Sequence, residues 1–554
     1  MKSIGQEDPK LQSDLDQKLH DIQLKGKELA AQELAKATNL PFIDLAHFPV
    51  NTAVLNMLDE GVARSGQLAI IAQDSRTLKI AIRDPRNEET KKILTDLLDR
   101  KFSLDLFVAS PEGLESVWKR YQHSRRIKVS PLGVVDISEE RIAELKEKIG
   151  GLEDLKKQLR ELKTTEALDL IIAGALKISA SDIHLEPEEA IIRVRYRLDG
   201  ILSNIGDLPT REYARILSRI KIISGLKINI HNTPQDGRFT IRLDSRDVEV
   251  RVSILPGAFG ENVVMRILDP LTTTQKLSSL GMRPDLLAIL EAELKKTSGA
   301  ILTTGPTGSG KTTSLYSFVR YLNREGIKII TIEDPIEYQI TGISQTQVDE
   351  HQGYTFASGL RSIVRQDPDV ILVGEIRDGE TAEIAIQAGL TGHLVFSTLH
   401  TNDAAGTIPR LIDLGARPVN IGPALNVAMA QRLVRKLCSC KEETPLPALE
   451  TEKIKKAFEQ LSPAVQLPVI SPEITIFKAK GCPKCNQGGY VGRIGIFELF
   501  LVSTDMERLI TTSPSIPQVR DLALKEGMVP MLQDGYLKVL EGATTLEEIY
   551  RVVS

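Results

Sequence analysis

The residues with the clearest chemistry lie in the glycine-rich stretch GPTGSGKTT, which runs from Gly305 to Thr313. It fits the pattern G-x-x-x-x-G-K-[ST], whose glycines let backbone N–H groups turn toward phosphate oxygens. Lys311 is expected to reach the β and γ phosphates of ATP, and Thr312 to bind Mg²⁺. An apolar run precedes the stretch and a helical pattern follows it, which is the order that the motif requires. We therefore predict an ATP site formed by Gly305, Pro306, Thr307, Gly308, Ser309, Gly310, Lys311, Thr312 and Thr313.

Two further apolar runs end in acidic side chains. DPDVILVGEIRD delivers Glu375 at the end of a short buried strand, and KIITIEDPIEY delivers Glu333, Asp334 and Glu337. A carboxylate at a strand tip beside phosphates can activate water or orient Mg²⁺. Gly374 stands where the second phosphate-loop signature commonly has aspartate. The alternative is that Glu375 is a surface carboxylate ending a core strand.

A fourth polar cluster, VFSTLHTNDA, carries His400 after another apolar run. A lone histidine is more often structural than catalytic. However, ligands of open α/β sheets bind at the carboxyl ends of the strands. We therefore place His400 in the same candidate site as Glu375.

Four arginines are candidates to stabilise charge on a transferred phosphoryl group, an effect of roughly 10³–10⁵ in rate. Arg361 and Arg365 in LRSIVRQ share one helical face because they are four residues apart. Arg251 in VEVRVS and Arg266 in VVMRIL lie in segments that alternate apolar and basic residues, as half-buried strands do. The alternative is that these arginines form ordinary surface salt bridges.

All four cysteines of the chain fall between residues 436 and 500: Cys438, Cys440, Cys482 and Cys485. Such a cluster in a cytoplasmic protein favours a metal site over disulfides. The C-x2-C pair of GCPKC has the spacing of a zinc knuckle, whereas LCSC is one residue short. We predict a structural zinc site with four sulfur ligands, and two unlinked pairs of thiols are the alternative.

Composition argues against two classes of protein. The formal net charge is -4 and aromatic residues make up 4%, so neither a basic nucleic-acid surface nor base-stacking platforms are expected. No apolar run approaches the ~18 residues of a membrane span, and the polar start lacks the apolar core of a signal peptide. We expect a cytoplasmic protein that touches a membrane only through partners.

The 554 residues suggest three or four domains. We predict an N-terminal domain over 1–125, a charged helical linker over 126–163 and a middle domain over 164–270. A second linker over 271–285 leads to a nucleotide-binding α/β domain over 286–554. This last domain includes the cysteine module, 436–500, and C-terminal helices, 501–554.

Taken together, GPTGSGKTT, TIEDPIEY, LRSIVRQDPDVILVGEIRD, STLHTND and AQRLVRKLC resemble the secretion ATPase superfamily. The chain looks most like the hexameric ATPases of type II secretion and type IV pilus assembly, strongly over 165–554 and loosely over 35–120. The resemblance implies a multidomain α/β fold: a RecA-like C-terminal domain after an α+β, PAS-like middle domain and a small α+β N-terminal domain. It also implies that EDPIE is the Asp box with Glu337 as water-activating base, that Glu375 is the essential Walker B glutamate, and that His400 marks the His box. Finally, it places Arg251, Arg266, Arg361 and Arg365 around the phosphates, with the middle domain clamping ATP.

These implications lead to an expected function. The chain is expected to be a cytoplasmic homohexamer at the inner-membrane face that hydrolyses ATP, with Mg²⁺ and Zn²⁺ as cofactors. Its N-terminal domain is expected to dock on a membrane platform protein, and its task is expected to be type IV pilus assembly. The type II secretion pseudopilus ATPase is the alternative, and a pilus retraction motor is disfavoured because such relatives lack the cysteine cluster. A nucleic-acid translocase or helicase is the alternative of another class. Repeated R-L-G segments that bind cyclic di-GMP in some relatives are not found.

Overall fold

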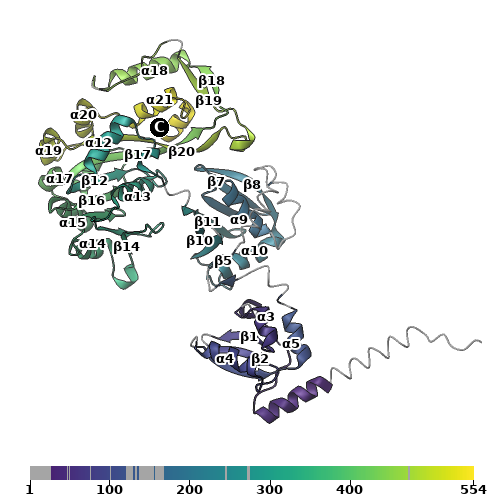
Figure 1. Cartoon of the computed structure of the whole chain (residues 1–554). Coiled ribbons are helices and arrows are strands. Elements are labelled where there is room, and N and C mark those ends of the chain that lie inside the picture. Colours follow the sequence, from purple (N-terminus) through teal and green to yellow (C-terminus); the bar gives the residue numbers. More distant parts are fainter. Residues whose placement is uncertain are drawn as a thin grey trace, which may run out of the picture. The chain divides into compact units, whose positions relative to one another are not determined.

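The structure, a computed structural model, describes residues 26–119, 121, 129–136, 155 and 167–553 apart from short gaps at 46–47, 49, 51, 56, 75–76, 100–101, 131–133, 244–245, 271–274, 464 and 472–473. The chain divides into two compact units. Figure 1 labels their helices and strands. The first takes in residues up to 139 with 221–226 and 238–245, and the second takes in 140–220, 227–237 and 246–554. Most of the predicted linker over 126–163 lies outside the described residues.

A three-stranded sheet forms the centre of the first unit. Strands β1 (Leu68–Asp74) and β2 (Thr77–Ile82) are antiparallel, and β2 is parallel to β3 (Ser103–Val108). Helix α4 (Glu88–Asp99) makes the crossover that parallel pairing of β2 and β3 requires. A helix over residues 26–38 begins the described part of the unit, and the other helices are α2 (Thr52–Leu55), α3 (Glu60–Ser65) and α5 (Pro111–Trp118). Apolar side chains of the three strands and of helices α2 to α5 form one core.

Two more strands of the first unit, with most of a third, belong to another sheet. The short strands β4 (Val129–Ser130) and β5 (Val134–Asp136) pair with each other, and β5 pairs with β9 (Gln235–Leu243) in parallel.

An antiparallel set of five strands opens the second unit, in the order β10-β11-β6-β7-β8. Every second side chain of β7 is buried, from Ile192 to Tyr196, so its arginines lie on the other face. Helices α9 (Ala167–Lys177) and α10 (Thr210–Ile223) accompany these strands. The strands are β6 (Asp182–Pro187), β7 (Ile191–Leu198), β8 (Ile201–Pro209), β10 (Arg246–Gly257) and β11 (Gly260–Leu268).

A seven-stranded sheet carries the rest of the second unit, in the order β14-β13-β15-β16-β12-β17-β20. Neighbours are parallel except for the antiparallel pair β17 and β20. The carboxyl ends of the parallel strands therefore share one edge, where ligands of such sheets bind. The strands are β12 (Gly299–Thr304), β13 (Ile329–Glu333), β14 (Ser344–Gln347), β15 (Val370–Val373), β16 (Leu394–Leu399), β17 (Leu425–Leu437) and β20 (Tyr490–Leu501).

Two apolar cores cover the two faces of this sheet. Along β12, Ile301 belongs to one core, whereas Ala300 and Leu302 belong to the other, because successive strand side chains alternate. Helices α12 (Pro284–Glu293) and α13 (Lys311–Leu322) contribute to the core with Ile301. The opposite core includes side chains of α14 (Phe356–Val364), α15 (Gly379–Leu390), α16 (Thr407–Asp413) and α17 (Pro418–Ala424).

The C-terminal part adds a small module to this sheet. Strands β18 (Glu442–Pro445) and β19 (Thr475–Lys478) form an antiparallel pair, and α18 (Ala448–Glu459) lies between them in the sequence. The short helix η4 (Pro483–Cys485) precedes β20. Four helices end the chain: α19 (Thr504–Thr511), α20 (Ile516–Lys525), α21 (Met531–Leu540) and α22 (Leu546–Val553). Among the described residues, no helix combines the length and apolarity that a membrane crossing needs.

Candidate active site

The glycine-rich stretch forms the loop between β12 and α13. Gly310 caps the helix with φ of 90°, and a Cβ at this position would lie 2.7 Å from the Gln431 side chain. Gly305 has φ of 146°, and a Cβ there would lie 2.7 Å from the Gln431 carbonyl oxygen. Both glycines are therefore required by the backbone conformation and by the neighbouring strand β17. The loop thus meets the N-terminus of an α-helix, which favours an anion.

The side chains of the loop are available for a phosphorylated ligand. Lys311 donates to the carbonyl oxygens of Gly305 at 2.6 Å and Pro306 at 3.1 Å. Burial lowers the pKa of Lys311, with the charge of Glu375 opposing this and that of Arg432 adding to it. The buried hydroxyl of Ser309 has no protein partner, and Thr312 is exposed. A half-buried cation and an unpaired hydroxyl fit a phosphate group.

Glu375 follows β15 at the same sheet edge and contacts two basic side chains. One carboxylate oxygen lies 3.1 Å from His400 Nε2, and the other accepts a hydrogen bond from Arg377. Burial raises the pKa of Glu375, but Arg377 and His400 outweigh burial, so the pKa lies below its ordinary value. Glu375 and His400, which were predicted from the sequence to share one site, are thus in direct contact.

Glu333, the last residue of β13, is buried and enclosed by donors. It accepts hydrogen bonds from the Tyr316 hydroxyl, the Thr331 hydroxyl at 2.6 Å and the Gln345 amide at 3.2 Å. Only 4% of Glu333 is exposed. These contacts fix the Glu333 carboxylate inside the protein, and its catalytic role stays a prediction.

Glu337 lies in the Asp-box loop, by which we mean residues 334–341, and is more accessible than Glu333. Its carboxylate accepts a hydrogen bond of 3.0 Å from Arg251, which also donates to the Ile336 carbonyl oxygen. The side chain of Glu337 is 32% exposed. Arg251 therefore contacts the residue proposed as the base.

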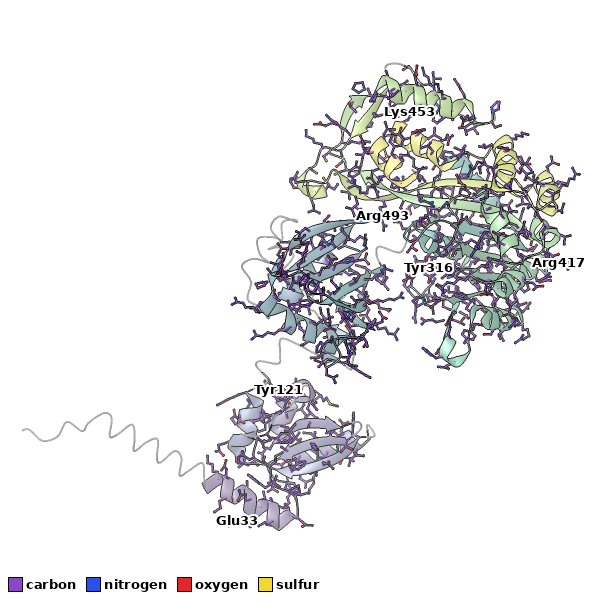
Figure 2. The ribbon with its side chains drawn as sticks, turned by 180° about the vertical axis from the view of Figure 1, so that it is seen from behind. Glu33, Tyr121, Tyr316, Arg417, Lys453 and Arg493 are labelled. Atoms are coloured by element: carbon purple, nitrogen blue, oxygen red, sulfur yellow. The ribbon has the colours of Figure 1, made fainter. Side chains whose placement is uncertain are left out.

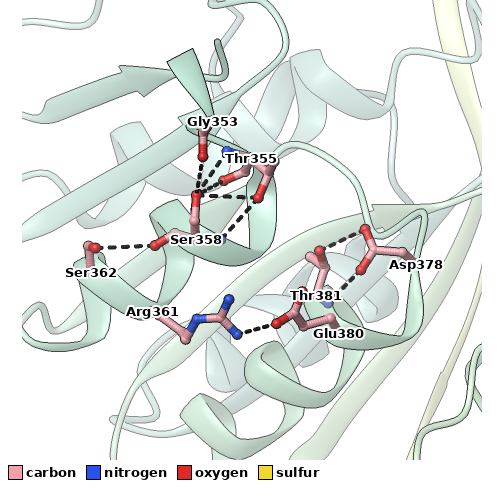
Figure 3. Close-up of polar contacts among 8 residues, drawn as sticks. All are labelled: Gly353, Thr355, Ser358, Arg361, Ser362, Asp378, Glu380 and Thr381. Atoms are coloured by element: carbon pink, nitrogen blue, oxygen red, sulfur yellow. Dashed lines mark hydrogen bonds and ion pairs between the residues drawn. The ribbon is translucent and has the colours of Figure 1, made fainter. Parts of the chain in front are cut away.

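The remaining three arginines differ in their surroundings. Arg266 donates to Asp182 at 3.0 Å and lines a cavity of about 440 Å³ together with Gly310 and Thr313. Arg361 donates to Glu380 on α15 (Figure 3). Arg365, which follows α14, donates to Ser362 on that helix at 3.3 Å. Arg266 is thus placed beside the phosphate loop, and the partners of Arg361 and Arg365 lie on α14 and α15.

The four cysteines form one cluster in the second unit. Their sulfur atoms all lie within 4.8 Å of one another. Cys438 and Cys482, and likewise Cys440 and Cys485, are separated by 3.8 Å between sulfurs. A tetrahedron with Zn–S bonds of about 2.3 Å has edges of about 3.8 Å. The four sulfur atoms therefore lie close enough together for a tetrahedral zinc site.

A family model described as type II/IV secretion system protein matches residues 158–551, which is more than half of the chain. The chain belongs to this family. A second model, of the MshEN domain, matches residues 38–128. The resemblance inferred from the motifs is thereby confirmed.

Two relatives illustrate the range of this family. The chain is 36% identical over 521 residues to a type IV pilus assembly ATPase PilB of Myxococcus xanthus, and the match covers 93% of the chain and 89% of that protein. It is 45% identical over 414 residues to a type II secretion system protein E of Pseudomonas aeruginosa, covering 74% of the chain and 80% of that protein. Secretion and pilus proteins are thus both similar to the chain.

Solved structures support the fold alone. The ATPase DotB of Yersinia pseudotuberculosis matches with a TM-score of 0.51 and 22% identity, covering 70% of the chain and 94% of DotB. DotB of Legionella pneumophila matches with a TM-score of 0.50 and 20% identity, covering 69% of the chain and 94% of that DotB. The predicted α/β fold class with a RecA-like domain is confirmed.

Sequence reasoning missed two residues of β17, Gln431 and Arg432, that lie close to the glycines of the phosphate loop. Gln431 accepts a hydrogen bond of 2.7 Å from Ser314, and Arg432 donates to the Asn402 carbonyl oxygen at 2.9 Å. Burial lowers the pKa of Arg432, as it does for Lys311. The motif AQRLVRKLC contained both β17 residues, but only the pairing of β17 with β12 brings them to the loop.

Proposed function

We propose that the chain is a Mg²⁺-dependent ATPase that powers the assembly of a type IV pilus. The observation that carries the hydrolytic part is the edge of the seven-stranded sheet. There the phosphate loop follows β12, the Asp-box loop follows β13, and Glu375 and His400 follow β15 and β16. A binding loop and acidic side chains at one edge support hydrolysis of a nucleoside triphosphate.

Each residue has a role in this reaction. Lys311 and the loop N–H groups hold the β and γ phosphates, and Arg266 adds positive charge from the cavity wall. Glu337 accepts a proton from the attacking water, so Arg251 must release the carboxylate that it now binds. Thr312 and Glu375 offer the oxygen ligands that Mg²⁺ prefers. When bound, Mg²⁺ would neutralise charge on the phosphate oxygens.

Pilus assembly is supported by the breadth of the match to the PilB relative, which spans 93% of the chain against 74% for the type II secretion relative. The type II pseudopilus ATPase remains the second candidate, because that relative is more identical within the matched region. A homohexamer at the cytoplasmic face of the inner membrane, docked on a platform protein, completes the proposal. The cysteine cluster would hold a structural Zn²⁺.

Lys311→Ala tests the hydrolytic part. The variant should lose ATP hydrolysis, because the loop loses the charge that opposes the phosphates. Lys295→Ala, which changes an exposed lysine after α12, is the matched control and should hydrolyse ATP at the parental rate. Hydrolysis by the Lys311 variant at the parental rate would exclude this site.

The same substitution in the cell separates the two pathways. Surface pili should disappear while protein secretion into the medium continues. The reverse outcome would replace pilus assembly by type II secretion and leave the ATPase proposal intact.

A further inference from the structure

The Asp-box loop has little regular structure, yet side chains from two elements hold its backbone. The N–H of Ile340 donates to Gln345 at 2.7 Å, and Asn323 donates to the Thr341 carbonyl oxygen at 2.8 Å. At the centre, the N–H of Glu337 donates to the Tyr316 hydroxyl at 3.3 Å. The backbone of the proposed base is therefore held by helix α13, the helix that begins at Lys311.

Tyr316 is rigidly placed for this contact. It is 1% exposed and lies inside the second unit (Figure 2). Its ring packs edge-on against the ring of Tyr338, with 4.6 Å between the ring centroids. The guanidinium of Arg320 lies over the same Tyr338 ring, 5.3 Å from its centroid. Both Tyr316 and Arg320 belong to α13, so the helix holds the loop through packing as well as hydrogen bonds.

The buried Glu333 fixes the direction of the hydroxyl. The Tyr316 hydroxyl donates to Glu333 and keeps its lone pairs for the Glu337 N–H. Burial and then Glu333 raise the pKa of Tyr316, which keeps its proton in place. Thr331 and Gln345 hold Glu333 in turn. The chain of contacts thus runs from β13 and β14 through Tyr316 to Glu337.

We propose that Tyr316 is a positioning residue for ATP hydrolysis. Its hydroxyl fixes the position of the Glu337 backbone relative to the phosphate loop, which lies at the start of the same helix. The inference rests on the proposed ATPase function. It assigns Glu333 the role of orienting Tyr316. A displacement of about 1 Å in a reacting group can cost about 10²-fold in rate, so one hydroxyl can affect turnover strongly.

Tyr316→Phe is the direct test, because it removes one oxygen and keeps the ring in its packing site. We expect kcat for ATP to fall at least about 10-fold. Affinity for a fluorescent ATP analogue should change less than about 2-fold, because the loop contacts of Lys311 remain. Tyr321→Phe is the matched control on the same helix, since Tyr321 is 40% exposed, and its turnover should be unchanged.

Combining Tyr316→Phe with Glu337→Gln tests the route of the effect. If Tyr316 acts through Glu337, adding Tyr316→Phe to the Glu337→Gln variant should hardly change the rate of single-turnover hydrolysis. Parental turnover of Tyr316→Phe, or equal loss of nucleotide affinity and turnover, would overturn the inference. A parental protein whose hydrolysis does not depend on Lys311 would instead overturn the proposed function.

Discussion

Glu333 and Glu337 are four residues apart in one acidic motif, but their surroundings are opposite. Glu333 is buried and accepts hydrogen bonds from three side chains, whereas Glu337 is partly exposed and meets Arg251. A base must reach the water that it activates, so exposure favours Glu337. Glu375 is half-buried at the sheet edge, where its carboxylate contacts Arg377 and the His400 ring.

Glu375→Gln should bind nucleotide but hydrolyse it roughly 10²–10⁴ times more slowly, because the amide removes the charge that acts on water or metal. Hydrolysis and nucleotide titration of the purified variant measure the two effects. Glu383→Gln, an exposed residue on α15, is the control. Loss of nucleotide binding by a folded Glu375→Gln protein would contradict this role.

At the scale of the elements, the positions where strands end could be predicted from the sequence. The direction in which the last side chain of each strand points could not. Apolar runs predicted the strands before Glu333, Glu375 and His400, and those strands exist as β13, β15 and β16. Whether Glu333 faces inward depends on Tyr316, which in the sequence is simply one residue of an apolar helix face. Such contacts join segments through tertiary packing, which local patterns do not encode.

The cysteine module shows the same limit. Spacing alone left the C-x-C pair in doubt, because Cys438 and Cys440 sit one residue closer than a zinc knuckle usually requires. The antiparallel pairing of β17 with β20 brings the Cys438 end of one strand toward η4, which precedes the other. The N–H groups of Cys482 and Gly489 also donate to Cys485 Sγ, at 3.1 and 3.2 Å.

We predict about one zinc per chain after purification without added metal. Cys440→Ser should lose most of this zinc, because it removes a ligand of the tetrahedron, while Ser439→Ala between the two cysteines should keep it. Elemental analysis of the three proteins measures the content. A stable parental protein without metal would leave the cysteines as ordinary thiols.

At the scale of the whole molecule, the proposed function requires the second unit to convert hydrolysis into movement. Two arginines of its antiparallel sheet are the proposed link between the two. Arg251 on β10 and Arg266 on β11 are directly opposite in the register of that sheet. Arg251 now meets Glu337 and Arg266 meets Asp182. To bind ATP, each guanidinium would have to leave its carboxylate partner and contact a phosphate group instead. Such an exchange of partners is a two-state change of the kind that drives domain motion.

The last prediction concerns this exchange. Arg251→Ala and Arg266→Ala should each lower kcat by at least about 10²-fold, by analogy with arginines that stabilise transferred phosphoryl groups. ATP affinity should change much less, because charge matched to the transition state contributes little to ground-state binding. Arg211→Ala is the control, since Arg211 is 83% exposed and pairs with the neighbouring Glu212. Steady-state hydrolysis and a fluorescent-nucleotide titration measure both quantities. Near-normal turnover of both variants would mean that the antiparallel sheet has no part in hydrolysis and serves only as a scaffold. Hydrolysis would then have to be coupled to movement through the seven-stranded sheet alone.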